Sequence, residues 1–292
     1  MPFVVLRLRL ALLQNNSFTV DVSSPVQIGT PMQSTAFGRT DIGCKRDNNQ
    51  DAIFADDSLG LYIVCDGMGG YEGGEVASSL AIETVVNYVR EHQRQFALMI
   101  KTGVMAKWLP MFVVDAIKRA NDKVCLHCAS NPVYEKMGTT LTMILVHDDH
   151  VVIGHCGDSR CYRIDEKLVL LTEDHTMGEE LRTHGWDEDE CRRYDNVLTQ
   201  VVGRIPFDEP DVITLAVDRE MKFMLCSDGL SPFLVGPEVD ELLRAVNRKA
   251  MADGMIELAL AGGGPDNISA IVVEVMPKSI VQSADAVSHA LL

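Results

Sequence analysis

The feature that most constrains the fold is a series of four short β-rich runs that follow one another with only a few turn residues between them. The runs are 139–147, 150–157, 160–164 and 167–174. Asp148-Asp149 and Gly157-Asp158-Ser159 lie at the breaks and are typical turn residues. Connections this short join antiparallel strands, because a parallel pair needs a crossover of about a dozen residues or more. The series therefore predicts an antiparallel sheet.

Helical and strand-like patterns alternate along the rest of the chain. The apolar run 59–67, LGLYIVCDG, predicts a buried strand, and helical patterns follow at 73–95 and 112–130. We expect further strands at 211–217, 221–229 and 267–275, with two helix-like segments between 237 and 261. Strands and helices in this order indicate an α+β fold.

The length of 292 residues and the hydrophobic content of 47% suffice for one large domain with a substantial core. We expect a flexible N-terminal extension at 1–33, a folded domain at 34–277 and a C-terminal tail at 278–292. The apolar N-terminal run carries two arginines and is too short to span a bilayer. The polar, acidic segment 176–196 predicts a partly helical excursion over the sheet edge and a candidate lid.

The charge balance narrows the choice of partners. The chain has 26 basic and 42 acidic residues, which gives a net charge of −16. Such a charge repels nucleic acid and anionic lipid, and no basic patch offsets it. A solvated acidic surface and a cluster of carboxylates held for cations both contribute to this number, so the charge alone does not separate them.

Eight cysteines are scattered along the chain, which differs from the dense pattern of a secreted disulfide scaffold. A reducing cytoplasm is therefore the expected compartment. Cys125 and Cys128 have a spacing that zinc sites use, but no second pair stands at a matching distance. We favour buried or half-exposed helix thiols for this pair.

Glycines crowd around the end of the strand at 59–67, where five of the eight residues after Asp66 are glycine. A phosphate-binding P-loop would need Gly-Lys-Ser/Thr to close the loop, and a dinucleotide fold would need parallel βαβ units. The sequence has neither. The strand-then-Asp-Gly pattern instead recurs at Asp228-Gly229, and Asp266-Asn267 stands directly before the last strand.

Three carboxylates at strand ends suit hard divalent cations, because magnesium and manganese take oxygen ligands. We interpret the neighbouring glycines as leaving room for the ion and its water. Earlier in the chain, Arg46 precedes the polar run that leads to Asp51. A guanidinium suits a phosphate dianion, whereas an exposed turn arginine is an equally good interpretation of Arg46 alone.

Taken in order, these motifs resemble the metal-dependent Ser/Thr protein phosphatases of type 2C, the PPM family, in their bacterial form. The motifs run from Arg46 to Val275 and are RDNNQDAIF, VCDGMGGYEGGEVAS, MGTTLTMILV, GHCGDSRCYRI, LTEDHT, LTQVVGR, LCSDGL and GGPDNISAIVV. The resemblance implies a four-layer α-β-β-α sandwich of two central antiparallel sheets flanked by helix pairs. It also places a metal site at one end of the sheets.

The resemblance implies a role for each matched residue. Asp66 would bridge two Mn²⁺ or Mg²⁺ ions, the Gly67 carbonyl would complete one site, and Asp228 and Asp266 would bind the other ion. Arg46 would hold the substrate phosphate. A hydroxide bridging the two metals would attack phosphorus directly, without a covalent enzyme intermediate.

Bacterial members of the family also use a third, weaker metal. We expect Asp228 and Asp174 to contribute to it, and Glu135 is the carboxylate nearest to the MGTT motif, where a further ligand is usual. We interpret Asp158 as a residue that fixes a turn rather than as a ligand. Cys156 lacks the phosphate loop of a cysteine phosphatase and is expected to be a core thiol.

The implied substrates are phosphoproteins, in particular those of a Ser/Thr kinase, and the implied state is a monomer. The alternative is a catalytically weak, phosphoprotein-binding regulatory domain on the same fold, whose expected signature is the loss of a metal aspartate. A calcium-sensing module would need a contiguous ligand loop, and none is found.

Three positions depart from the family pattern. Gln50 stands where many members have glutamate, Met68 where animal members have a histidine general acid, and Tyr71 where bacterial members commonly have histidine. An amide at position 50 can still hydrogen-bond a metal-bound water. Protonation of the leaving group must come from a group other than residue 68.

Overall fold

The structure is a computed structural model that describes residues 32–69, 73–102, 105–245 and 247–277. The predicted extension at 1–33 lies outside these ranges except for Met32 and Gln33, and the predicted tail lies wholly outside them. Met32 and Gln33 belong to a strand, so the folded part of the chain begins before residue 34. None of the described helices is both long and apolar enough to cross a membrane.

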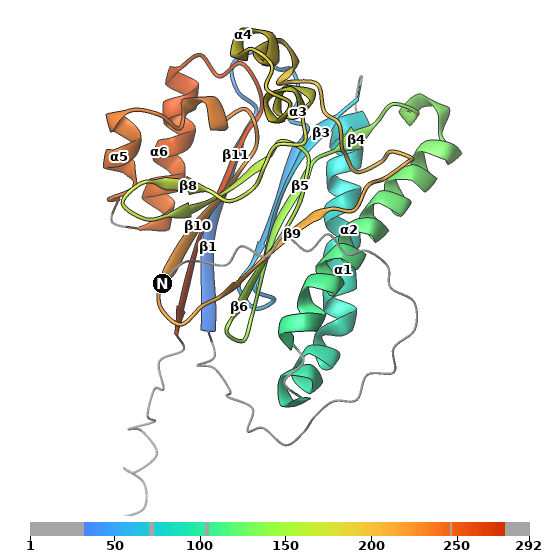
Figure 1. Ribbon diagram of the computed structural model, residues 1–292, viewed down its shortest axis with the longest axis vertical. Helices are drawn as coiled ribbons and strands as arrows, with labels where there is room; N and C mark the ends of the chain where they lie inside the picture. Colours follow the sequence, from blue (N-terminus) through green and yellow to red (C-terminus); the bar gives the residue numbers. More distant parts are fainter. Residues whose placement is uncertain (1–31, 70–72, 103–104, 246, 278–292) are drawn as a thin grey trace, which may run out of the picture.

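Two antiparallel sheets form the centre of the molecule (Figure 1). The strands of the first sheet are, in spatial order, β1 (Met32–Asp41), β11 (Ile268–Pro277), β10 (Met221–Cys226), β7 (Arg160–Ile164) and β8 (Leu168–Leu170). The second sheet contains β2 (Asp51–Asp56), β3 (Leu61–Met68), β5 (Leu141–His147), β6 (His150–Cys156) and β9 (Asp211–Ala216), with β4 (Gly138–Thr139) paired to β3. The prediction of antiparallel pairing is confirmed.

A pair of helices covers the outer face of each sheet. Helices α1 (Gly73–Thr102) and α2 (Met105–Ser130) pack on the second sheet, and α5 (Pro237–Leu242) and α6 (Arg248–Ala261) pack on the first (Figure 1). Two short helices, α3 (Met177–Thr183) and α4 (Glu188–Cys191), lie at one end of the sandwich. The predicted α+β sandwich with flanking helix pairs is confirmed.

Strands β3 and β11 are buried on both faces, which explains why they have few polar residues. In β3, Leu61, Ile63 and Cys65 pack against α1 and α2. Tyr62 and Val64 point the other way, into the layer between the two sheets. Because both faces are buried, the strand appears in the sequence as one continuous apolar run. β11 is buried on both faces in the same way.

Some boundaries differ from the sequence prediction. Helix α2 begins at Met105 rather than near 112. Of the strand expected over 167–174, only Leu168–Leu170 has strand structure. β1 was not predicted, because its sequence is largely polar. It pairs with β11 along its whole length, from Met32 opposite Pro277 to Asp41 opposite Ile268.

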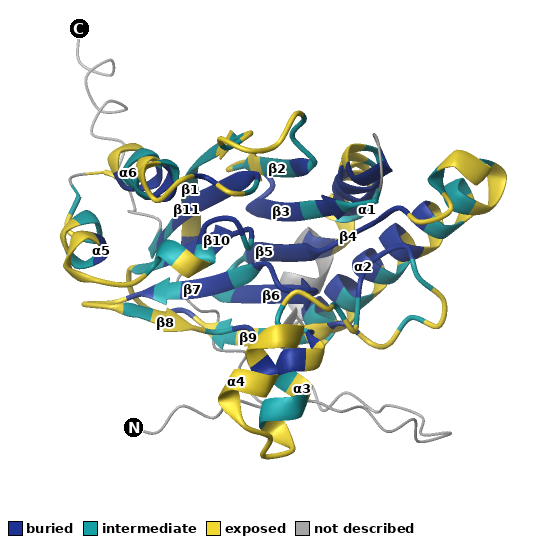
Figure 2. Cartoon of the chain, turned by 90° about the horizontal axis from the view of Figure 1, so that it is seen from above, coloured by how far each residue is buried: buried dark blue, intermediate teal, exposed yellow. Residues whose placement is uncertain are grey.

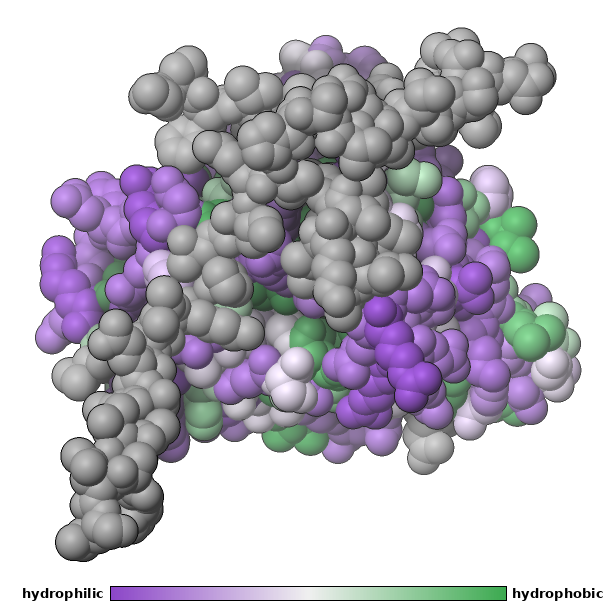
Figure 3. Space-filling view, turned by 90° about the horizontal axis from the view of Figure 1, so that it is seen from below, coloured by the Kyte–Doolittle hydropathy of each residue, from purple (hydrophilic) through white to green (hydrophobic). Residues whose placement is uncertain are grey.

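The predicted site residues lie at the end of the sandwich that is uppermost in Figure 1. In an antiparallel pair, the start of one strand lies beside the end of its neighbour. Asp51, which begins β2, is therefore the direct partner of Asp66 in β3. Figure 2 shows the molecule from this end, with the buried strands in the middle and α3 and α4 at one side, beside β9. The opposite end, seen in Figure 3, is mostly hydrophilic where residues are coloured.

Candidate metal centre

Asp66 is held by the two threonines of the MGTT motif. Its N–H donates to Thr140 Oγ1 at 2.8 Å, while its carbonyl oxygen accepts from the Thr140 N–H at 2.8 Å and from Thr139 Oγ1 at 2.9 Å. Burial raises the pKa of the Asp66 carboxyl well above its ordinary value, and the nearby carboxylates of Asp51 and Asp228 raise it further. The backbone of Asp66 is fixed, and its side chain is costly to ionise without a cation.

The glycines have a different role from the one inferred from sequence. A methyl group on Gly67 would collide with the backbone oxygens of Gly74 and Gln50, and one on Gly229 would collide with the backbone oxygen of Asn267. The interpretation that these glycines leave room for an ion is therefore wrong. They allow backbones to approach closely, which brings the aspartate-bearing turns together.

Asp228 follows β10 and lies half-buried beside Asp66. Its pKa is raised, chiefly by burial. Within the described ranges, Asp228 Oδ1 and Asp51 Oδ1 are buried without a hydrogen-bond donor. Buried carboxylate oxygens without donors are uncommon and fit a place where a cation binds.

Asn267 organises the loop that carries Arg46. Its Oδ1 accepts from the Gln50 N–H at 2.8 Å, and its Nδ2 donates to the carbonyl oxygens of Ile42 and Asn48 at 2.9 Å each. Its neighbour Asp266 accepts from Arg46 Nη2 at 2.7 Å. This hydrogen bond raises the pKa of the Arg46 guanidinium.

Asp51 also lies at this site, although the sequence identified it only as a residue at the start of a strand. Its Oδ2 accepts from Ser227 Oγ at 2.8 Å and from Ser269 Oγ at 2.6 Å. Burial raises its pKa to about 7. It lies opposite Asp66 in the β2–β3 register and therefore adds to the negative charge behind the site.

Of the two further aspartates, Asp158 lines the cavity and Asp174 does not. Burial raises the pKa of Asp158 to about 7. Asp174 instead accepts hydrogen bonds on both carboxylate oxygens from Arg160, at 2.7 to 3.1 Å. The structure thus does not bring Asp174 to the cavity, because Arg160 already engages it. Glu135 is exposed and does not line the cavity either.

The site is an open cavity of about 1040 Å³. In the described part of the chain, one arginine and five aspartates line it: Arg46, Asp47, Asp66, Asp158, Asp228 and Asp266. Such an excess of carboxylate oxygen suits hard divalent cations. Among the described residues, no group of three or more acidic, histidine or cysteine side chains is arranged so that it could hold a metal ion. Asp266 is turned toward Arg46 instead.

The positions that depart from the family pattern also lie here. Gln50 lines the cavity and donates from Nε2 to the Gly69 carbonyl at 3.3 Å. Met68 lines this cavity and a neighbouring pocket. Tyr71 lies outside the described residues.

The segment 176–196 contains α3, α4 and a 3₁₀ turn, so the prediction of a partly helical excursion is confirmed. Arg182 pairs with Glu179, Glu188 and Asp195, and Cys191 is buried beneath them. The mobility of this segment stays a prediction.

Comparison with known proteins bears directly on this site. The profile of the family described as protein phosphatase 2C matches residues 44–264. A serine/threonine phosphatase, stp, of Listeria monocytogenes is 31% identical over 244 residues, which cover 81% of this chain and 94% of that protein. The serine/threonine protein phosphatase PstP of Mycobacterium tuberculosis is 31% identical over 243 residues, which cover 82% of this chain but only 44% of that longer protein.

Solved structures of similar chains agree. The crystal structure of PstP from Mycobacterium tuberculosis has a TM-score of 0.71 and 30% identity, covering 83% of this chain and 98% of that one. The catalytic domain of PstP in complex with two manganese ions has the same TM-score of 0.71, with 84% and 99% covered. The profile match encloses the loop of Arg46, the strand ends of Asp66 and Asp228, and most of the sandwich. This chain is therefore a member of the protein phosphatase 2C family.

Proposed function

We propose that this protein is a metal-dependent protein serine/threonine phosphatase. The observation that carries the proposal is the meeting of Asp66, Asp228 and Asp266 with Arg46 in one cavity. Three carboxylates supply the oxygen ligands of divalent cations, and a guanidinium supplies a fork for a phosphate dianion.

We propose for each group the role that the family resemblance implies. Asp66 and the Gly67 carbonyl would hold one Mn²⁺ or Mg²⁺ ion, and Asp66, Asp228 and Asp266 the other. Two bound cations would activate a water molecule for attack on phosphorus and offset the charge of the phosphate. Arg46 would leave Asp266 to bind the phosphate, and Asp51 would keep negative charge behind Asp66.

For a third, weaker ion we propose Asp158 together with Asp228 in place of the pair of Asp228 and Asp174. Asp158 lines the cavity beside Asp228, and its carboxylate is close enough to raise the pKa of Asp66. Asp174 would have to give up its two-oxygen pairing with Arg160.

The alternative of a catalytically weak, phosphoprotein-binding domain gains no support. Such a domain is expected to lose at least one metal aspartate, whereas all three are present and face the same cavity. The relatives are also named as phosphatases.

The substrates of this proposed activity are phosphoserine and phosphothreonine residues of proteins modified by a Ser/Thr kinase.

A cytoplasmic setting is supported by the cysteines, all eight of which are free thiols. We propose a monomer, which size-exclusion chromatography with light scattering tests.

Activity on a small aryl phosphate and on phosphothreonine peptides tests the proposal. We expect turnover with Mn²⁺ or Mg²⁺, none after exhaustive chelation, and recovery when the metal is returned. Undiminished turnover in chelator would contradict a metal-dependent mechanism. Absence of turnover at saturating Mn²⁺, in a protein whose thermal unfolding shows that it binds the ion, would favour the regulatory alternative.

A further inference from the structure

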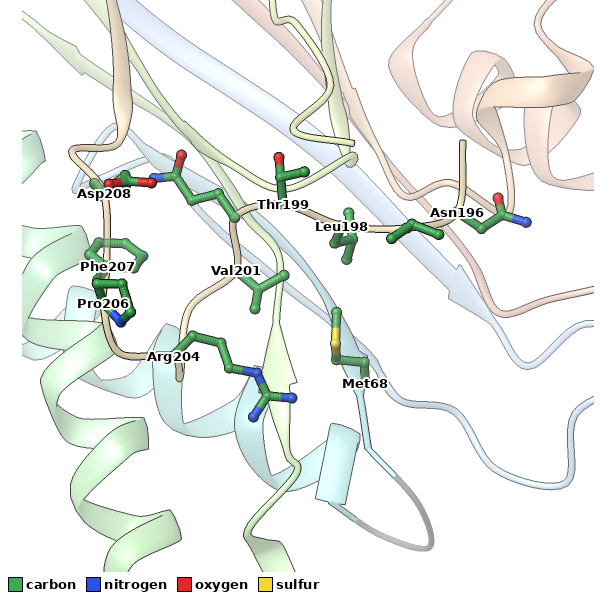
Figure 4. Close-up of a pocket in the computed structure, with 11 residues that line it drawn as sticks. Met68, Asn196, Leu198, Thr199, Val201, Arg204, Pro206, Phe207 and Asp208 are labelled. Carbon is green, nitrogen blue, oxygen red and sulfur yellow. Dashed lines mark hydrogen bonds between the residues drawn. The ribbon is translucent and has the colours of Figure 1, made fainter. Parts of the chain in front are cut away.

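A second pocket of about 490 Å³ opens beside the metal cavity. Met68, Asn196 and Leu198 line both spaces, so the two are continuous. Figure 4 shows that the pocket is bounded mainly by the segment 196–208, which folds around it, and by Met68 from the end of β3. A peptide that placed a phosphorylated residue at Arg46 would therefore pass close to this pocket.

The wall of the pocket is fixed from beneath. Asn121 of α2 is buried, and its Oδ1 accepts from the N–H groups of Gly203 at 2.8 Å and Arg204 at 3.2 Å. Val202 exchanges two backbone hydrogen bonds with Thr139, at 2.9 and 3.0 Å. These contacts hold the segment against the body of the domain, so the pocket is present before any ligand binds.

Arg204 is the cation of this pocket. Its Nη2 donates to the Lys136 carbonyl at 3.0 Å, which orients the guanidinium but leaves most of its five N–H donors unused. Within the described ranges, no carboxylate lies close enough to Arg204 to form an ion pair. In Figure 4 the guanidinium extends toward Met68, that is, toward the metal cavity.

Arg204 places a positive charge beside a cavity that five aspartates line. The protein carries a net charge of −16, and the other arginine near the site, Arg46, is paired with Asp266. Among the described residues, Asp208 is the one carboxylate that lines the pocket, and it stands away from the Arg204 guanidinium in Figure 4. The side nearest the metal cavity is thus positively charged and complementary to an anion.

The remaining wall combines an apolar part with the polar side chains of Asn196, Thr199 and Gln200. The apolar part consists of Leu198, Val201, Pro206 and Phe207, and Val201 is buried. This surface suits the methylene stem of a short acidic side chain whose carboxylate reaches the guanidinium. A wholly apolar side chain would cover Arg204 without pairing it, which costs the guanidinium its hydration.

We propose that this pocket binds an aspartate or glutamate of the substrate, close in sequence to the phosphorylated residue, and that Arg204 selects it. The inference rests on the proposed phosphatase activity and specifies its substrates: phosphoserine or phosphothreonine segments with an acidic flank.

The test uses phosphothreonine peptides with neutral flanks in which one glutamate is moved through the positions on either side, each paired with a glutamine peptide. At the best position we expect kcat/KM for the glutamate peptide to exceed that for its glutamine partner by about 5- to 10-fold, mainly through a lower KM. Arg204→Gln is expected to bring this ratio close to one, and Arg204→Lys to restore part of it. The aryl phosphate rate normalises each variant.

Arg90→Gln is the matched control, because it removes the same charge from α1, where Arg90 lies 4.0 Å from Asp56 and lines neither space. It should keep the preference for glutamate. A ratio near one in the wild type at every position, or a ratio that survives Arg204→Gln, would overturn the inference. A preference for leucine over glutamate would assign the pocket to an apolar residue and overturn it as well. Failure to hydrolyse even the aryl phosphate would instead remove the proposed function.

Discussion

Arg46 donates a hydrogen bond from Nη2 to Oδ2 of Asp266 at 2.7 Å. Arg46, which we propose binds phosphate, is therefore hydrogen-bonded to Asp266, which we propose binds metal. Asp266 has a partner in Arg46 when no ion is bound, and a cation bound by Asp266 would free the Nη2 donor of Arg46 for a dianion. With the proposed roles, metal binding and phosphate binding would be linked through this pair, since each ligand would stabilise the arrangement that the other requires.

Arg46→Ala separates the two sides of this exchange. We expect KM for a phosphopeptide to rise roughly tenfold, because a two-point contact with the dianion is lost. Mn²⁺ affinity should hold or increase, because the ion no longer competes with a guanidinium for Asp266. Calorimetric Mn²⁺ titration and steady-state kinetics measure the two effects. A loss of Mn²⁺ affinity at unchanged KM would show that Arg46 is structural.

Asp66→Asn tests the central ligand. The change keeps the shape of the side chain but removes its charge, so we expect kcat to fall by roughly 100-fold or more. The metal-free protein should be at least as stable as the wild type, because a carboxyl that is costly to ionise has been replaced by a neutral amide. Turnover with Mn²⁺ and thermal unfolding in chelator check both parts. Activity within a few-fold of wild type would reject the assignment.

The sequence could predict how the three aspartates proposed as ligands meet. Asp66 lies near the end of the buried strand β3, Asp228 lies two residues after β10, and Asp266 lies two residues before β11. Antiparallel pairing sets strand ends beside strand starts. β1 was not predicted, because its sequence is polar and it forms a strand by pairing with β11. Local patterns do not contain this information.

The sequence also does not show which side chains far apart along the chain become hydrogen-bond partners. The serines that hold Asp51 lie 176 and 218 positions away. No spacing rule could show that Arg160 would engage Asp174 and leave Asp158 at the cavity. The Asp-Gly turns were recognised, but their glycines serve backbone packing, which depends on the neighbours that the fold supplies.

Paired variants distinguish Asp158 from Asp174 as a metal ligand. Asp158→Asn should weaken the response of the protein to Mn²⁺ at high concentration and leave the fold intact. Asp174→Asn should leave that response unchanged but lower the free energy of unfolding by roughly 1–3 kcal/mol, because the half-buried Arg160 loses its partner. Mn²⁺-dependent activity curves and urea unfolding measure these effects. The reverse result would return the third site to Asp174.

The stability of the metal-free protein should fall as the pH rises from about 6.5 to 8. Burial raises the pKa of Asp51 and of Asp158 from 3.8 to about 7, so the folded state binds protons that the unfolded state has already released. Their contribution is fully present below pH 3.8 and is lost as the pH rises through 7. His155, whose pKa burial lowers to about 3, gives the opposite slope only below its ordinary value of 6.5.

Urea unfolding in chelator across this pH window measures the slope. Saturating Mn²⁺ should flatten or reverse the fall of stability with pH, because the ions replace the protons. Without metal, Asp51→Asn should make this fall smaller. A metal-free protein that gains stability between pH 6.5 and 8 would contradict the raised pKa values.

Gln50→Glu asks what the amide at this position does. Gln50 lines the cavity and donates from Nε2 to the Gly69 carbonyl at 3.3 Å, a bond that glutamate cannot make when ionised. The new carboxylate would also join a cavity in which five aspartates already face one arginine. The metal-free variant should therefore be less stable than the wild type, and this loss should be smaller at pH 6 than at pH 8.

With metal the balance reverses, since an added anion favours cation binding. We expect the Mn²⁺ concentration for half-maximal activity to fall modestly, roughly 2- to 5-fold, with kcat nearly unchanged. Gln50→Met, which removes the donor without adding charge, is the control and should destabilise without any gain in Mn²⁺ affinity. Weaker Mn²⁺ binding by Gln50→Glu than by the wild type would show that this side chain does not act on the ion.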